Sequence, residues 1–240
     1  MPYALITGSA KRIGKEIALF LAKHGWDIII HYNTSEDKAN QLQDEVISLG
    51  RKCIIYKSNF LHADDYNQIM QEFKIGLLVN NASMFENDNL HNLKEKDLLN
   101  NLKVNFSTPL ILSKALMQSH SGVDGQVNII NILDNIIFKL PKNFISYYFS
   151  KTSLANFTKL AAKLYAPKVR VNGIALGQIM QNPKQSEANF EKTKNAAPLE
   201  YGATVDEICY TIDFILKTKS LTGQIISLDG GSHLDNLNYP

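Results

Sequence analysis

Short runs of apolar residues alternate with amphipathic segments along the whole chain. The runs are mostly continuous rather than alternating in polarity, which is typical of strands buried on both faces of a sheet. They cover residues 3–7, 28–32, 53–56, 77–80, 127–132, 169–174 and 225–228. Between them, apolar residues recur at helical spacing, as in Ile13, Ile17 and Leu21. The alternation predicts a doubly wound, seven-stranded parallel α/β sheet of Rossmann type.

Glycines mark where the first two predicted helices end. Gly25 and Gly50 each follow an amphipathic stripe and are predicted to end a helix. Further helices are predicted within 95–118, 148–165 and 204–216. Residues 178–203 show little periodicity and are expected to form a loop or short helices, either covering a ligand crevice or running over the surface. We therefore expect residues 1–240 to form a single domain with a substrate loop at about 178–203.

Composition narrows the class of partner. Lys and Arg number 25 against 23 Asp and Glu, a net charge of +2 without a basic block, which argues against nucleic-acid binding. No apolar run approaches the ~20 residues that span a bilayer, and residues 1–7 lack the basic segment of a secretory signal. Cys53 and Cys209 are predicted to be buried thiols, and the six histidines show no metal-ligand spacing. We expect a cytoplasmic protein without a metal, a membrane or a nucleic acid.

The first strand leads into a glycine-containing turn, residues 8–14, before a helix begins. Gly8 allows a tight turn, Gly14 allows close packing, and the free N–H groups of the helix suit a pyrophosphate. Because position 10 is alanine, the generic G-x-G-x-x-G pattern is absent, and a simple turn remains the alternative.

Charge at this turn indicates the type of dinucleotide. An NAD site usually has a carboxylate at the end of the second strand, but here an amide and two hydroxyls occupy 33–35, with no acid before Glu36. Lys11 and Arg12 add cations that suit a 2′-phosphate. The pattern predicts NADPH; the alternative is that both cations are solvated surface charges.

Tyr147 and Lys151 form the candidate proton-transfer pair. At a spacing of four residues they share one face of a helix. A neighbouring ammonium is expected to lower the pKa of the Tyr147 phenol from ~10 toward working pH, which suits a proton donor in a reduction. Alone, such spacing usually marks a surface pair. Tyr148 cannot replace Tyr147 because position 152 is threonine.

Further motifs follow in order: Asn80-Asn81-Ala82, Asn105, Val171-Asn172-Gly173, Leu221-Thr222-Gly223 and Asp229-Gly230-Gly231. With the glycine turn and the Tyr–Lys pair, the sequence resembles the short-chain dehydrogenase/reductase family over nearly its whole length. The resemblance implies nicotinamide hydride transfer and a homotetramer. It also implies that Asn105 holds a proton-relay water, that Lys151 binds the nicotinamide ribose, and that Asn81 and Ala82 line the cofactor path.

Three details resemble the pteridine reductases within that family. They are Lys11-Arg12-Ile13-Gly14, the segment Asn81-Ala82-Ser83-Met84-Phe85, and Asp134 in place of the usual catalytic serine. The resemblance implies that Phe85 stacks on a pterin ring; the alternative is a core aromatic. Asp134 could instead merely cap a turn.

The exchange of serine for Asp134 changes the chemistry that the site supports. A serine hydroxyl donates to a substrate carbonyl, whereas an ionised aspartate cannot and would repel an alkoxide. Aspartate accepts from N–H groups, or delivers a proton if its pKa is raised. Asp134 therefore favours reduction of a C=N bond in a nitrogen heterocycle over simple ketone reduction.

Three departures from the family pattern lie near the cofactor. Leu176-Gly177 replaces the common Pro-Gly, which leaves the backbone there less restricted. Asn59 replaces an acid that often meets the adenine, although an amide oxygen also accepts that hydrogen bond. Thr34 replaces a cation that binds the 2′-phosphate in some pteridine reductases.

The candidate residues are as follows. The catalytic candidates are Asp134, Tyr147, Lys151 and Asn105. The substrate candidates are Phe85, Asp134 and Tyr147. The cofactor candidates are Gly8, Lys11, Arg12, Ile13, Gly14, Asn33, Thr34, Ser35, Asn59, Phe60, Asn81, Ala82, Ser83, Tyr147, Lys151 and Gly177.

Together these residues predict an NADPH-dependent reductase of a small dihydropterin, such as dihydromonapterin, dihydrobiopterin or dihydrofolate. Two alternatives remain. One is a carbonyl reductase resembling the 3-oxoacyl-carrier-protein reductases, against which Asp134 counts. The other is a non-catalytic NADPH-binding regulatory protein, which would need no proton relay. The helical stripe of Leu154, Phe157, Leu160 and Leu164 could serve a tetramer interface or the core.

Overall fold

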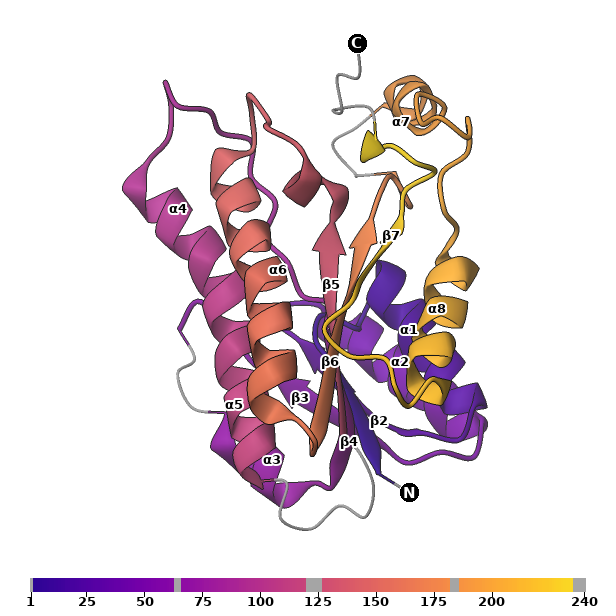
Figure 1. The fold of residues 1–240 in the computed structure, drawn as a ribbon. Helices are drawn as coiled ribbons and strands as arrows, with labels where there is room; N and C mark the ends of the chain where they lie inside the picture. The colour runs from indigo at the N-terminus through magenta and orange to yellow at the C-terminus, as the bar shows by residue number, and fades with distance from the viewer. Residues whose placement is uncertain (1, 63–65, 120–126, 182–185, 235–240) are drawn as a thin grey trace.

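The computed structural model describes residues 2–62, 66–119, 127–181 and 186–234. Seven parallel strands form one sheet in the order β3-β2-β1-β4-β5-β6-β7 (Figure 1). They are β1 Tyr3–Ile6, β2 Asp27–Tyr32, β3 Cys53–Lys57, β4 Ile75–Asn80, β5 Val127–Asp134, β6 Val169–Leu176 and β7 Ile225–Leu228. The predicted doubly wound sheet is confirmed. Its order reverses between β1 and β4, and ligands of such sheets bind beyond the strand ends at that reversal.

Helices cover both faces of the sheet. The helical elements are α1 Arg12–Lys23, α2 Glu36–Ser48, α3 Asn67–Glu72, α4 Glu95–Leu102, η1 Lys103–Ser107, α5 Thr108–Ser119, η2 Asn135–Phe138, α6 Ile145–Tyr165, α7 Glu187–Lys194 and α8 Val205–Lys217. Figure 1 shows α1, α2 and α8 on one side and α4, α5 and α6 on the other. The single helix predicted within 95–118 is instead interrupted by the π-helical turn η1.

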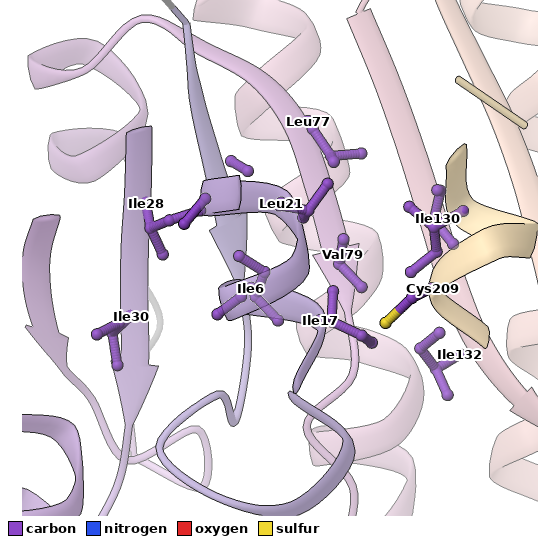
Figure 2. Close-up of a cluster of buried hydrophobic side chains, with 14 of the residues drawn as sticks. Ile6, Ile17, Leu21, Ile28, Ile30, Leu77, Val79, Ile130, Ile132 and Cys209 are labelled. Carbon is purple, nitrogen blue, oxygen red and sulfur yellow. The ribbon is translucent and has the colours of Figure 1, made fainter. Parts of the chain in front are cut away.

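Each strand contributes side chains to the hydrophobic clusters on both faces of the sheet, because successive side chains point in opposite directions. On β1, Ile6 packs in the cluster beneath α1, whereas Leu5 packs in the cluster beneath α5 and α6. Figure 2 shows the first cluster, in which Ile17 and Leu21 of α1 meet the sheet and Cys209 comes from α8. Both thiols are buried, as predicted, and burial raises the pKa of Cys209 to about 12, so this thiol is held in its unreactive form.

A buried arginine from β6 ends α8. The guanidinium of Arg170 donates hydrogen bonds to the backbone oxygens of Ile215, Leu216, Thr218 and Leu221 at 2.8–3.1 Å. These carbonyls lie in or just beyond the last turn of the helix, where acceptors lack partners within the helix. One side chain from the sheet thus satisfies the C-terminal end of α8.

Two predicted features are only partly described. Within 178–203, residues 182–185 lie outside the described residues, while α7 confirms a short helix in that segment. On α6, Leu154 and Phe157 pack in the core, whereas Leu160 and Leu164 are 55% and 65% exposed. The predicted apolar stripe therefore divides between core and surface. In the described part of the chain, no helix is long and apolar enough to cross a membrane.

Candidate active site

Two adjoining pockets open beyond the carboxyl ends of the central strands. The first has a cavity volume of about 400 Å³ and follows β1, β2 and β3. The second has a volume of about 870 Å³ and follows β4, β5 and β6. Arg12, Ile13, Asn81 and Ser83 line both, so the two pockets form one continuous crevice at the reversal of strand order.

Every cofactor candidate of the sequence lines this crevice. The first pocket contains Gly8, Lys11, Arg12, Ile13, Gly14, Asn33, Thr34, Ser35, Asn59, Phe60, Asn81, Ala82 and Ser83. The second contains Tyr147, Lys151 and Gly177 with the substrate candidate Phe85 and with Asp134. Lining residues that the sequence did not single out include His31, Ser58 and Met84 in the first pocket and Phe144 and Met180 in the second.

The glycine turn is built for close approach. Gly8 has φ +65°, and a Cβ on Gly14 would lie 2.6 Å from the Gly8 oxygen. The Asn81 amide donates to the backbone oxygen of Thr7 at 2.8 Å, which joins the turn to the segment after β4. Helix α1 starts here without a side-chain cap and without an acid in its first turn. Its N–H groups are therefore oriented to bind an anion, and the residues fit a dinucleotide pyrophosphate.

His31, at the end of β2, supports this turn from below. Its Nδ1 accepts from the Gly8 N–H at 3.0 Å, so the ring proton must lie on Nε2, which donates to the Ser58 oxygen at 3.1 Å. The ring stacks on Phe60 with centroids 4.0 Å apart and is 3% exposed. Burial lowers the pKa of His31 from 6.5 to about 4, so the imidazole stays neutral. In the sequence, His31 is a polar residue within the apolar run 28–32, and this position could have indicated its role.

The depressed pKa of His31 predicts an acid-sensitive fold. An unfolded chain takes up a proton near pH 6.5, whereas the folded chain does so only near pH 4, so stability present above pH 6.5 is lost as the pH falls through that window. The expected loss is about 3 kcal/mol of unfolding free energy. Denaturant unfolding of the wild type and of His31→Gln at pH 7 and pH 4 measures it.

The control for this measurement is His24→Gln, because His24 is exposed at the end of α1. Only His31→Gln is expected to flatten the pH dependence. If both variants lose as much stability in acid as the wild type, the buried neutral imidazole is not its source.

The two cations of the turn take different directions. Lys11 precedes α1 and lines only the first pocket. Arg12 has a left-handed backbone, φ 57°, and its guanidinium donates to the backbone oxygens of Gln181 at 2.9 Å and Met180 at 3.3 Å. Arg12 also lines the first pocket, and its part in binding the 2′-phosphate stays a prediction. In this structure Arg12 connects the turn to the loop that follows β6.

Asp134 serves two purposes at the end of β5. Its Oδ1 accepts from the Ile136 N–H at 2.8 Å and so caps η2, while its Oδ2 accepts from the Tyr147 hydroxyl at 3.0 Å. The capping role and the catalytic placement, which the sequence left as alternatives, are thus both present. One oxygen holds the backbone, and the other faces the phenol inside the second pocket.

Burial controls the acidity of this pair. It raises the pKa of Asp134, and it also raises the pKa of Tyr147 well above 10, with the carboxylate of Asp134 adding to the second shift. The expectation that Lys151 lowers the pKa of Tyr147 is therefore wrong here, because desolvation and the neighbouring carboxylate dominate. The raised pKa of Tyr147 keeps its phenol protonated, which suits a proton donor rather than a base.

Lys151 lies deeper than its partner. Its Nζ donates to the Ile132 oxygen at 2.9 Å and lies 5.6 Å from the centroid of the Tyr147 ring. Burial lowers the pKa of Lys151 to about 8, and the nearby charge of Asp134 partly opposes that shift. The ammonium is thus anchored to β5, and Lys151 lines the second pocket.

Asn105 does not line either pocket. Within the π-helical turn η1, its side chain accepts from the Met84 N–H at 2.8 Å, and donates to the Met84 oxygen at 2.9 Å and the Ser150 hydroxyl at 3.0 Å. The structure therefore places Asn105 behind the pocket, where it joins the segment after β4 to α6. It also accepts from the hydroxyl of Ser83, a residue that lines both pockets, at 3.3 Å, and the relay water that the resemblance assigns to Asn105 stays a prediction.

Three aromatic rings form one wall of the second pocket. Phe85 is 44% exposed and stacks on Phe144, with centroids 4.5 Å apart and planes inclined by 16°. The Tyr147 ring lies perpendicular to Phe85, with centroids 4.8 Å apart and planes at 90°. Phe85 is therefore no core residue. Phe144 belongs to no sequence motif, so only the structure identifies it as part of this wall.

The Rossmann sheet, the phosphate-binding turn and the buried Tyr–Lys–carboxylate group together define a nucleotide-dependent oxidoreductase. Comparison with known families makes this specific. The model of the short-chain dehydrogenase family matches residues 2–192, and the chain belongs to that family.

Individual relatives cover almost the whole chain. The structure of FolM alternative dihydrofolate reductase 1 from Brucella suis, in complex with NADP, superposes with a TM-score of 0.91 at 32% identity and covers 97% of this chain and 95% of that chain. A 3-oxoacyl-acyl-carrier-protein reductase, FabG of Staphylococcus epidermidis, is 26% identical over 96% of this chain and 98% of its own. The corresponding reductase of Synechocystis is 29% identical over 95% of each.

Proposed function

We propose that this protein is an NADPH-dependent reductase of a C=N bond in a dihydropterin. The observation that carries the proposal is the Asp134 carboxylate 3.0 Å from the Tyr147 hydroxyl, in the pocket that Phe85 also lines. A half-buried carboxyl with a raised pKa suits protonation of a ring nitrogen. The NADP-bound FolM structure, named a dihydrofolate reductase, supports both the cofactor and the substrate class.

Each residue has a separate part in the proposed reaction. NADPH, when bound, supplies the hydride for the ring carbon. Tyr147 donates one proton to the ring nitrogen, and Asp134, whose Oδ2 lies 3.0 Å from the Tyr147 hydroxyl, returns a proton to the phenol. Lys151 binds the ribose, and the exposed face of Phe85 packs on the flat pterin ring. Lys11, Arg12 and the polar side chains of residues 33–35 bind the 2′-phosphate.

Loss of NADPH absorbance in the presence of a dihydropterin tests this function. We expect dihydropterin-dependent oxidation of NADPH and formation of the tetrahydropterin, with NADH much less effective because residues 33–35 include no acid for its ribose. NADPH oxidation with acetoacetyl thioesters alone would reject the pterin assignment.

A carbonyl reductase remains the second candidate because the FabG relatives cover 96% of the chain. It predicts acyl-thioester reduction, for which a donor hydroxyl rather than Asp134 is the suitable group. A non-catalytic NADPH-binding protein is the third, and would bind NADPH without turning over either substrate.

We also propose a homotetramer, supported by the exposed Leu160 and Leu164 of α6.

A further inference from the structure

Asp88 is a buried acid that lines neither pocket and contacts the start of α6. It lies in the segment that follows β4 and is 5% exposed. A carboxylate so far from water needs strong hydrogen bonds to offset its desolvation. The hydrogen-bond partners of Asp88 therefore show what stabilises it in this buried position.

Those partners are the first residues of α6. One carboxylate oxygen accepts from the Ser146 N–H at 3.2 Å, and the other accepts a short hydrogen bond from the Ser146 hydroxyl. The backbone oxygen of Asp88 accepts from the Phe144 N–H at 2.6 Å. Asp88 thus satisfies N–H groups at the helix start, where the helix itself provides no acceptors.

The backbone that Asp88 holds is a strained one. Phe144 has φ 63° and ψ 38°, in the left-handed region that side chains other than glycine rarely adopt. Such a residue persists only where the surrounding structure determines its conformation. The hydrogen bonds of Asp88 on either side of Ile145 are contacts that do so.

These bonds also determine the spacing of the aromatic wall. Phe85 lies three residues before Asp88, and Tyr147 directly follows Ser146. Phe85 stacks on Phe144 and lies perpendicular to the Tyr147 ring. The contact between Asp88 and Ser146 therefore joins the two segments that carry the flat surface of the pocket and its phenol.

We propose that Asp88 is a positioning residue for the reaction: by binding Ser146 and Phe144, it sets the Tyr147 hydroxyl relative to Phe85 and hence to the ring that packs there. This inference rests on the proposed function for the nature of that ring. Asp88 does not touch the substrate, and it acts through the start of α6.

Asp88→Ala, compared with the wild type, tests the proposal. We expect kcat to fall about 10- to 100-fold, because a small displacement of a proton donor is costly, while the Kd for NADPH changes less than about twofold because the first pocket is untouched. Asp88→Asn keeps an acceptor for the Ser146 N–H and an amide that donates to its hydroxyl, so it is expected to restore most of kcat. Hydrogen exchange at the Ser146 amide is expected to accelerate in Asp88→Ala.

Two serine variants of α6 form a matched pair. Ser146→Ala removes only the bond from its hydroxyl to Asp88, so it is expected to lower kcat less than Asp88→Ala does. It should add little when combined with Asp88→Ala, because that variant has already lost this bond. Ser153→Ala removes a hydroxyl that bonds only one turn back along the helix, to the Phe149 oxygen, and should leave kcat unchanged.

The results that overturn the proposal are distinct from those that overturn the function. Asp88→Ala with wild-type kcat, or with kcat and NADPH affinity reduced together, rejects Asp88 as a positioning residue. If the wild type reduces only carbonyl substrates, the pterin function fails, but kcat on those substrates and the exchange rate at Ser146 still decide the role of Asp88.

Discussion

Tyr147→Phe is expected to lower kcat for dihydropterin reduction by about 10²- to 10⁴-fold, the range usual for loss of a general acid. The variant keeps the ring that meets Phe85 and removes only the hydroxyl that donates to Asp134 at 3.0 Å. NADPH affinity should fall less than kcat, because the variant keeps the ring and leaves every residue of the first pocket in place. Steady-state kinetics with an NADPH titration separate the two effects.

Tyr148→Phe is the matched control for this change. It removes the same atom from the next residue of the same helix, where the phenol lines neither pocket. We expect it to keep the wild-type kcat. Equal losses in the two variants would indicate damage to α6, and an active Tyr147→Phe enzyme would require another proton donor.

Asp134→Asn is expected to reduce pterin turnover by a similar ~10²- to 10⁴-fold and to change its pH dependence. The amide oxygen can still cap the Ile136 N–H, so η2 should be retained, but the amide cannot deliver a proton. Since burial raises the pKa of Asp134, the wild-type rate should be high where the acid is protonated and decline as pH rises through that pKa. This decline should be absent in the variant.

Asp134→Ser distinguishes the two proposed substrate classes. A serine at this position supplies a donor for a developing alkoxide. The change should disable C=N reduction and leave carbonyl reduction intact or improved. A full pterin activity in Asp134→Ser, measured against the same NADPH concentration, would contradict a proton-transfer role for this carboxyl.

The sheet and the cofactor turn could be predicted because their determinants are local. Continuous apolar runs mark each strand, and Gly8 and Gly14 occupy places where φ +65° or a 2.6 Å approach requires the absence of a side chain. The break in the helix predicted within 95–118 could not be predicted from the sequence. Apolar residues continue across Lys103–Ser107, while the backbone changes there to a π-helical turn.

The orientations of the site side chains depended on tertiary packing and could not be read from spacing. Spacing placed Lys151 beside Tyr147, but it could not show that Nζ binds the Ile132 oxygen or that burial outweighs its charge. The same holds for Asn105, which turns toward Met84, and for Arg12, which binds the loop after β6. Asp88 had no sequence signal, because its partner Ser146 is 58 residues away.

The buried guanidinium of Arg170 has a consequence for how this chain folds. The last turn of α8 is completed by a residue on β6, 45 positions earlier in the chain, rather than by a neighbour of its own. That helix end can reach its final stability only once β6 is in place, since until then its carbonyls depend on water. We therefore expect the last turn of α8 to gain its full stability together with β6.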